Sequence, residues 1–162
     1  MLENNDERMI FYCKGVIETV KKLGWSPEII HCQGWFASLI PMYIKKIYNE
    51  DPLFKDTKVI YNVFDTEFEG SLNLGLINKL LFEKKLEASD LELLTEPTFE
   101  NLNKFAIKYS DAVIHGSEKI NEGVSKYMKD SEWPFMAYPG EEEYEEQYNN
   151  FFDSFARDCN SI

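Results

Sequence analysis

Apolar residues recur at helical spacing near the start of the chain. Residues three and four apart lie on one face of an α-helix, so this pattern predicts an amphipathic helix over residues 9–23. Asn5 or Asp6 is expected to cap its first turn. Gly24 is expected to end it, because glycine readily takes the left-handed conformation that closes a helix. The apolar stripe consists of Ile10, Cys13, Val16, Ile17, Val20 and Leu23.

Short apolar runs at four later places predict β-strands. Each run is rich in the β-branched and aromatic residues that favour sheets. They cover residues 28–32, 58–64, 112–116 and 134–139, and the second of them reads KVIYNVF. Continuous apolar runs of this length are typical of strands in a sheet interior.

Helical patterns separate and follow these runs. We expect helices over residues 36–47, 72–86, 101–109, 118–128 and 144–155, and a short acidic connection over 87–100. Pro41 lies within the first of them and has no N–H to donate, so the regular helix should start near Ser38 or be kinked. Ser117 is expected to cap the helix over 118–128. The last helix carries an aromatic stripe of Tyr144, Tyr148, Phe151, Phe152 and Phe155.

The alternation of strands and helices decides the fold class. Strands separated by helices at this spacing predict a three-layer α/β domain with a mostly parallel sheet and helices on both faces. The chain has 162 residues, which is the length of one ordinary domain. No repeat or linker interrupts it, so residues 1–162 are expected to form a single domain.

Composition and charge exclude several classes of function. With 44% hydrophobic residues the chain can bury a core, and its net charge of −12 opposes binding to nucleic acid or to an anionic membrane. Three widely spaced cysteines give no disulfide framework, and two histidines make a dedicated zinc site improbable. No apolar run approaches the roughly 20 residues that span a bilayer. The start, MLENNDER, lacks the apolar core of a signal peptide, so we expect a cytoplasmic protein.

Candidate chemistry gathers where the predicted strands end. Parallel sheets bind ligands outside the carboxyl ends of their strands, and three such ends carry polar residues. At the first, His31 could orient a ligand or act as a base, or it could be hydrogen-bonded within the fold. Trp35 could stack on a sugar or a nucleobase, or it could anchor the core. Cys32 forms no dyad with His31 by spacing alone, because neighbours on a strand point to opposite faces.

The other two strand ends offer carboxylates and a hydroxyl. Asp65, Glu67 and Glu69 stand two apart, a spacing that could hold a divalent cation beside a sugar nucleotide or simply form a solvated acidic loop. Ser117 follows His115 and Gly116, and it could face a phosphate or only cap a helix. The chain has no phosphate-binding glycine loop and no ordered pair of nucleophile and base. The residues alone therefore give only weak evidence for a ligand-binding or catalytic site at the strand ends.

Two long stretches resemble the glycogen and starch synthase family. They cover roughly residues 5–70 and 99–125, and contain the segments EIIHCQGWFASLIP, KVIYNVFDTEFEG and FENLNKFAIKYSDAVIHGSEKINEGV. In that family a similar strand ends in a His-x-His-Asp-Trp-His pattern, followed by small residues and Leu-Ile-Pro. A later strand ends in Ile-His-Asn-Leu-Ala-Tyr-Gln-Gly, and an Asn-x-x-Lys helix follows. The order and length of the match make the resemblance specific.

The resemblance implies a fold and an activity. The family has the GT-B fold, two Rossmann-like domains with a cleft between them. It transfers glucose from ADP-glucose or UDP-glucose to the end of an α-1,4-glucan, without a metal ion at the centre. The chain resembles the second part of the N-terminal domain. The resemblance therefore implies no cofactor other than the donor sugar nucleotide, and an α-glucan as the partner molecule.

The resemblance also selects the site residues. His31, Trp35 and Lys104 fit the family pattern, whereas other positions depart from it. Gln33 and Phe36 stand where the family has histidines, and Gly34 stands where it has an aspartate. In the next strand Phe64 replaces a histidine, and Asp65 replaces an asparagine. The substrate-binding candidates are thus His31, Gln33, Gly34, Trp35, Phe36, Phe64, Asp65 and Lys104, with no residue assigned to catalysis or to a metal.

These departures lead to three hypotheses. The first is a glycogen/starch synthase-like chain that is inactive alone, because the family's Lys-x-Gly-Gly-Leu loop and its C-terminal domain have no counterpart here. The second is a non-catalytic module that binds an α-glucan, or a partner chain that completes the GT-B fold. The third is a metal-dependent sugar-nucleotide enzyme. Residues that precede Met1 in a longer protein would add strands to the sheet, and without them we expect the helix over 144–155 to cover the sheet edge.

Overall fold

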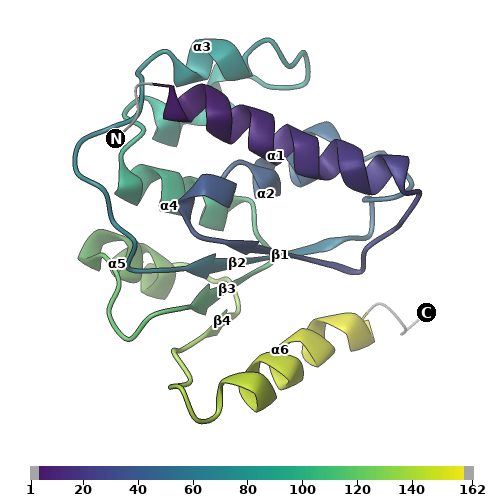
Figure 1. Cartoon of the computed structure of the whole chain (residues 1–162), viewed down its shortest axis with the longest axis vertical. Helices are drawn as coiled ribbons and strands as arrows, with labels where there is room; N and C mark the ends of the chain where they lie inside the picture. Colours follow the sequence, from purple (N-terminus) through teal and green to yellow (C-terminus); the bar gives the residue numbers. More distant parts are fainter. Residues whose placement is uncertain (1–3, 159–162) are drawn as a thin grey trace.

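Four parallel strands form the centre of the protein, in the order β1-β2-β3-β4. The computed structural model describes residues 4–158 (Figure 1). The strands are β1 (Ile29–Gln33), β2 (Lys58–Val63), β3 (Ala112–His115) and β4 (Phe135–Met136). The helices are α1 (Asn5–Lys22), α2 (Ile40–Met42), α3 (Leu76–Leu80), α4 (Phe99–Lys108), α5 (Glu122–Asp130) and α6 (Tyr144–Asp158), with short helical turns η1 (Trp35–Ala37), η2 (Tyr43–Ile47) and η3 (Ala88–Leu94).

The sheet register joins distant parts of the chain. Ile30 lies opposite Val59 on β2, and Tyr61 lies opposite Val113 on β3. Every crossover between neighbouring strands contains a helix, as parallel pairing requires. The predicted fold class, an α/β protein with a parallel sheet, is confirmed.

Helices cover both faces of the sheet, but unequally. The main core lies on one face, where buried side chains of α1, α2, α4 and α5 pack against Val59, Tyr61 and Val113. On the other face, α6 is the only helix among the described residues that packs, over Ile60 and Ala112 among others. Figure 1 shows α6 alone on that side of the sheet. The prediction that this helix covers the sheet edge is wrong in position, because it lies over a face.

The first helix begins earlier and ends as the sequence predicts. Its first residue is Asn5, and the expected side-chain cap at Asn5 or Asp6 does not form. Asp6 is instead buried within the first turn, where its carboxylate accepts a hydrogen bond from Lys79 Nζ at 2.6 Å. At the other end Gly24 has φ +62° and donates to the Lys21 carbonyl, which gives the left-handed closure expected of glycine.

Proline breaks the helix that follows β1. Pro41 lies in the first positions of α2, where its missing N–H costs no hydrogen bond. The segment is therefore a series of short pieces, η1, α2 and the π-helical turn η2, rather than one regular helix. The sequence predicted either a helix that starts late or a kinked helix. The structure shows both, because α2 starts at Ile40 and the helical segment is interrupted.

Three predictions between β2 and β4 are wrong. The helix expected over 72–86 is regular only in α3, and the stretch 87–100 contains η3 and the start of α4 rather than a mere connection. The cap of α5 is Asn121 and not Ser117, because the Asn121 side chain accepts from the Val124 N–H at 3.1 Å.

Within residues 4–158, no helix is both long enough and apolar enough to cross a membrane.

Asp111, which precedes β3, bonds to the neighbouring strand β2 and to Lys45. Its Oδ2 accepts from the Val59 backbone N–H at 2.7 Å and lies 2.6 Å from Lys45 Nζ. We expect Asp111→Ala to lower the free energy of unfolding by about 2 kcal/mol, because a buried N–H and a lysine both lose their partner. Urea denaturation followed by circular dichroism measures this. Asp56→Ala is the matched control, since the Asp56 side chain is 84% exposed, and an equal loss in both variants would contradict the assignment.

Candidate functional site

The carboxyl ends of β1, β2 and β3 lie side by side. Gly34 follows β1 with φ +71° and donates its N–H to the Asn62 carbonyl at 3.0 Å. Gly116 follows β3 and donates to the Val63 carbonyl at 2.8 Å. These two bonds extend the sheet past its last regular residues. They bring together the three strand ends that the sequence singled out.

His31 points to the side of the sheet that α6 covers. Its ring packs edge-on against Phe152, with centroids 5.1 Å apart, and against Tyr148 at 5.9 Å. The Gln33 Nε2 atom lies 3.4 Å from His31 Nδ1. Burial lowers the pKa of the His31 imidazole below its ordinary value, so the ring is neutral at neutral pH. The structure thus brings His31 and Gln33 together. The His31 ring packs against aromatic rings, whereas Gln33 is exposed.

Asn62 is a further candidate residue, which the sequence interpretation missed. It is fully buried on β2, on the same face as His31, and its Nδ2 donates to Tyr148 Oη at 2.6 Å. Burial raises the pKa of the Tyr148 phenol to about 12, so this oxygen remains protonated. The signal in the sequence was a single amide inside the apolar run KVIYNVF, because a buried amide in a strand needs a polar partner.

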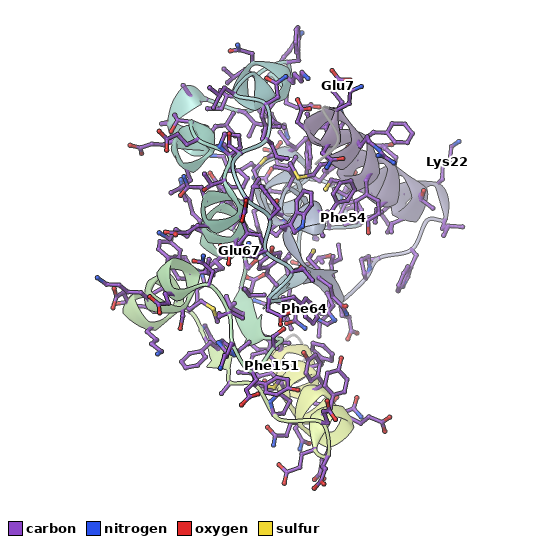
Figure 2. The ribbon with its side chains drawn as sticks, turned by 60° about the vertical axis from the view of Figure 1, so that its left-hand side comes forward. Glu7, Lys22, Phe54, Phe64, Glu67 and Phe151 are labelled. Carbon is purple, nitrogen blue, oxygen red and sulfur yellow. The ribbon has the colours of Figure 1, made fainter. Side chains whose placement is uncertain are left out.

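The loop after β2 is tied to the loop after β3. The Asp65 N–H lies 3.2 Å from Ser117 Oγ, which donates in turn to Asp65 Oδ1 at 3.1 Å. Farther along, Asn121 Nδ2 donates to Glu67 Oε1 at 2.8 Å. Ser117 therefore holds a loop rather than a helix start. These bonds fix Asp65 and Glu67 on the side of α4 and α5, where Figure 2 shows Glu67.

The carboxylates at 65, 67 and 69 do not assemble a metal site. Among the described residues, no group of three or more histidine, cysteine, aspartate or glutamate side chains could hold a metal ion. Asp65 and Glu67 bind the side chains of Ser117 and Asn121 instead. The hypothesis of a metal-dependent enzyme built on Asp65, Glu67 and Glu69 therefore has no geometric support.

Aromatic side chains surround the turn after Gly34. Trp35 packs edge-on against Phe68 at 4.8 Å and against Phe36 at 5.2 Å, and Phe68 continues the chain of contacts to Phe99. These rings connect the turn to the main core, so Trp35 serves as a half-buried anchor whose remaining surface is open. Phe64 is also half-buried and lies 4.0 Å from where a side chain at Gly34 would begin. Figure 2 shows Phe64 near the strand ends.

Lys104 lies apart from His31. It is on α4, where it forms an ion pair with Glu100 one helical turn away, and its Nζ is 5.8 Å from the Tyr127 ring centre. Glu100 borders an open hollow of about 630 Å³ at the start of α5. The candidate residues are thus separated: His31 lies beneath α6, Asp65 lines this hollow, and Trp35 and Phe36 pack against the main core. The described lining of the hollow is Asp65, Glu67, Glu100, Lys119, Ile120, Asn121, Glu122 and Gly123.

A parallel sheet with polar side chains at its carboxyl edge defines the class of protein. It is a Rossmann-like α/β protein of the kind that holds its ligand where the strands end. A family model described as the starch synthase catalytic domain matches residues 1–133. The chain therefore belongs to the starch synthase catalytic-domain family, and the resemblance to glycogen and starch synthases is confirmed.

Curated relatives give the same assignment. The chain is similar to a glycogen synthase of Chlorobium luteolum, with 41% identity over 83 residues, 51% of this chain and 17% of the relative. It is 28% identical to glycogen synthases of Pelodictyon phaeoclathratiforme and Clostridium perfringens, over 78% and 82% of this chain and 26% of each relative. The chain thus spans about a sixth to a quarter of the length of the relatives it matches. No solved structure matches it significantly.

Proposed function

We propose that this glycogen synthase-like chain retains part of the family's sugar-binding framework and transfers no glucose by itself. The family activity, glucosyl transfer from ADP-glucose or UDP-glucose to an α-1,4-glucan, would then require groups that this chain does not supply. His31, Gln33, Gly34, Trp35, Phe36, Phe64, Asp65 and Lys104 are the proposed substrate-contacting positions. They supply a framework with few groups that carry a proton or a positive charge.

The charge around the hollow carries this proposal. Asp65, Glu67, Glu100 and Glu122 face it, against the single cation of Lys119 among its described lining residues. Lys104, the lysine that fits the family pattern, is already paired with Glu100. A departing nucleoside diphosphate needs cations or aligned dipoles to stabilise its negative charge. An acidic hollow of this kind repels a diphosphate.

Incorporation of labelled glucose into glycogen tests the proposal. We expect the purified chain, given ADP-glucose or UDP-glucose, to incorporate no more label than a reaction without protein. A full-length glycogen synthase from Clostridium perfringens serves as the positive control. Incorporation by this chain that Lys104→Ala abolishes would overturn the proposal, since it would assign the activity to this site.

An alternative is a non-catalytic module that binds an α-glucan or a partner chain. The half-buried rings of Trp35, Phe36 and Phe64 beside the Gly34 turn favour the glucan version, because sugars stack on aromatic faces. The side chains of Phe11 and Phe82 are 81% and 86% exposed, which favours a partner chain that supplies the rest of the GT-B fold.

Titration with maltoheptaose tests the glucan version. We expect the amide NMR signals of residues 33–36 and 64–65 to shift at millimolar sugar, and the Trp25 signals to remain fixed as an internal control, since Trp25 lies in the loop between α1 and β1. Sugar at about 10 mM is enough to reveal binding with a millimolar Kd. If no signal shifts up to that concentration, the glucan version is contradicted.

A further inference from the structure

Helix α6 lies outside the residues that the family model matches. The match ends at residue 133, whereas α6 is Tyr144–Asp158. It is joined to β4 by residues 137–143, which include Gly140 with φ +78° and three exposed glutamates in a row, 141–143. In Figure 1 it lies on the far side of the sheet from α1, α2 and α4.

The contact beneath α6 is small and aromatic. The buried members of this cluster are Ile60, Ala112, Ile114 and Tyr148, with Phe151, Phe152 and Phe155 only partly buried around them. The main core on the opposite face contains many more side chains. A helix held by one small cluster opens at a lower free energy than the helices of the main core.

Two polar atoms are left without partners beneath this helix. Neither His31 Nε2 nor Asn62 Oδ1 has a hydrogen-bond partner among the described residues, although both atoms are buried. If Gln33 Nε2 donates to His31 Nδ1, the imidazole proton is on Nε2, so Nε2 is a donor. Asn62 Oδ1 is an acceptor. Leaving a buried polar group unpaired is unfavourable, so the closed arrangement leaves two hydrogen-bonding groups unsatisfied.

A donor and an acceptor on adjacent strands suit one class of ligand. Both side chains adjoin Tyr148, His31 through its ring and Asn62 through a hydrogen bond to the phenol oxygen. Sugar hydroxyls both donate and accept, so the several hydroxyls of a sugar offer partners for a donor and for an acceptor. The hydrocarbon face of a sugar ring can also replace the aromatic contact that Phe152 makes with the imidazole.

From this geometry we infer that α6 is a displaceable cover over a sugar-hydroxyl site formed by His31 Nε2 and Asn62 Oδ1. The cover and an oligosaccharide compete for the same face of β1 and β2. The ligand class rests on the glucan version of the proposed function, but the mobility of the cover does not. Apparent affinity is reduced by the fraction of molecules in which α6 is closed.

The first arm of the test measures the cover without sugar. In the full chain, Phe152→Ala removes a ring that packs on His31, and NMR titration of the imidazole follows its exposure to water. We expect the His31 pKa of the variant to rise toward the ordinary value for histidine, and Phe82→Ala, an exposed phenylalanine, to leave it unchanged. A folded Phe152→Ala variant with an unchanged His31 pKa would overturn the proposal.

The second arm adds maltoheptaose to the same variants. We expect Phe152→Ala to bind about tenfold more tightly than the unmodified chain, because less of the protein is closed. Asn62→Leu with Phe152→Ala should lose this gain, since leucine has a similar shape and lacks the acceptor that Asn62 Oδ1 provides. Equal affinity of Phe152→Ala and the unmodified chain would overturn the cover. Absence of sugar binding to every variant would overturn the glucan site, and the imidazole titration would still decide the cover.

Discussion

Replacing Gly116 by alanine is expected to destabilise the protein by about 3 kcal/mol, near the upper end of what overpacking costs. An added Cβ would lie 2.8 Å from the Val63 carbonyl oxygen and 2.1 Å from Asn62 Oδ1. Neither atom can move freely, because Val63 belongs to the central strand β2 and Asn62 is fully buried. The substitution therefore pushes apart β2 and β3 where the candidate site begins. Urea denaturation followed by circular dichroism gives the loss in unfolding free energy.

Gly123→Ala is the matched control for this substitution. Its Cβ also meets another residue, at 2.3 Å, but the atoms are those of the Glu100 carboxylate, the far end of a flexible side chain. Gly123 is in α5, where alanine favours the helix by about 0.5–1 kcal/mol relative to glycine. We expect a net change within about 1 kcal/mol. Equal losses at 116 and 123 would contradict the claim that the rigidity of β2 decides the outcome.

Phe105→Ala is expected to have the largest effect of any substitution considered, a loss of about 3–5 kcal/mol. Phe105 is fully buried on α4 and packs edge-on against Tyr109, with ring centres 5.2 Å apart. Removing the ring leaves a cavity in the main core. Because domains are stable by only about 5–15 kcal/mol, a large fraction of the variant should be unfolded at 37 °C. Calorimetry and the urea midpoint report this directly.

Phe82 supplies the control of the same residue type. Its side chain is 86% exposed, so Phe82→Ala should change stability by less than about 0.5 kcal/mol. A comparable loss in both variants would show that the phenylalanine at 105 does not act through burial. Retention of full stability by Phe105→Ala would contradict the burial of this ring in the main core.

The sheet could be predicted from the sequence because each strand is a continuous apolar run. All four strands lie within the predicted runs or extend one residue beyond, as β1 does at Gln33. Apolar spacing was a poorer guide over residues 72–100. There Leu76, Leu80, Leu91 and Leu94 are all buried, but they come from separate short turns rather than one helix. The spacing of these leucines therefore predicted which side chains are buried, but it did not predict the secondary structure that buries them.

The strand ends were predictable as a location, but the direction of their side chains was not. Proximity followed from parallel order, whereas the separation of His31 under α6 from Asp65 beside α5 depends on which residues face which layer. Ser117 illustrates the limit. A serine before a helical stretch satisfies the rule for a cap, yet its hydroxyl bonds Asp65 and the cap falls to Asn121. The Ser117 hydroxyl could cap a helix or bond to the loop after β2, and the contact between the two loops favours the second arrangement.

The long crossover between β2 and β3 has a consequence for the time course of folding. The hydrogen bond from Val59 to Asp111 joins residues 52 apart in sequence. Such a contact forms only after the intervening chain has been ordered or brought back, at an entropic cost that precedes any gain from pairing. We therefore expect refolding to be limited by the meeting of β2 with β3, with α1 formed beforehand. Substitutions at their junction, such as Asp111→Ala, should slow refolding more than they speed unfolding.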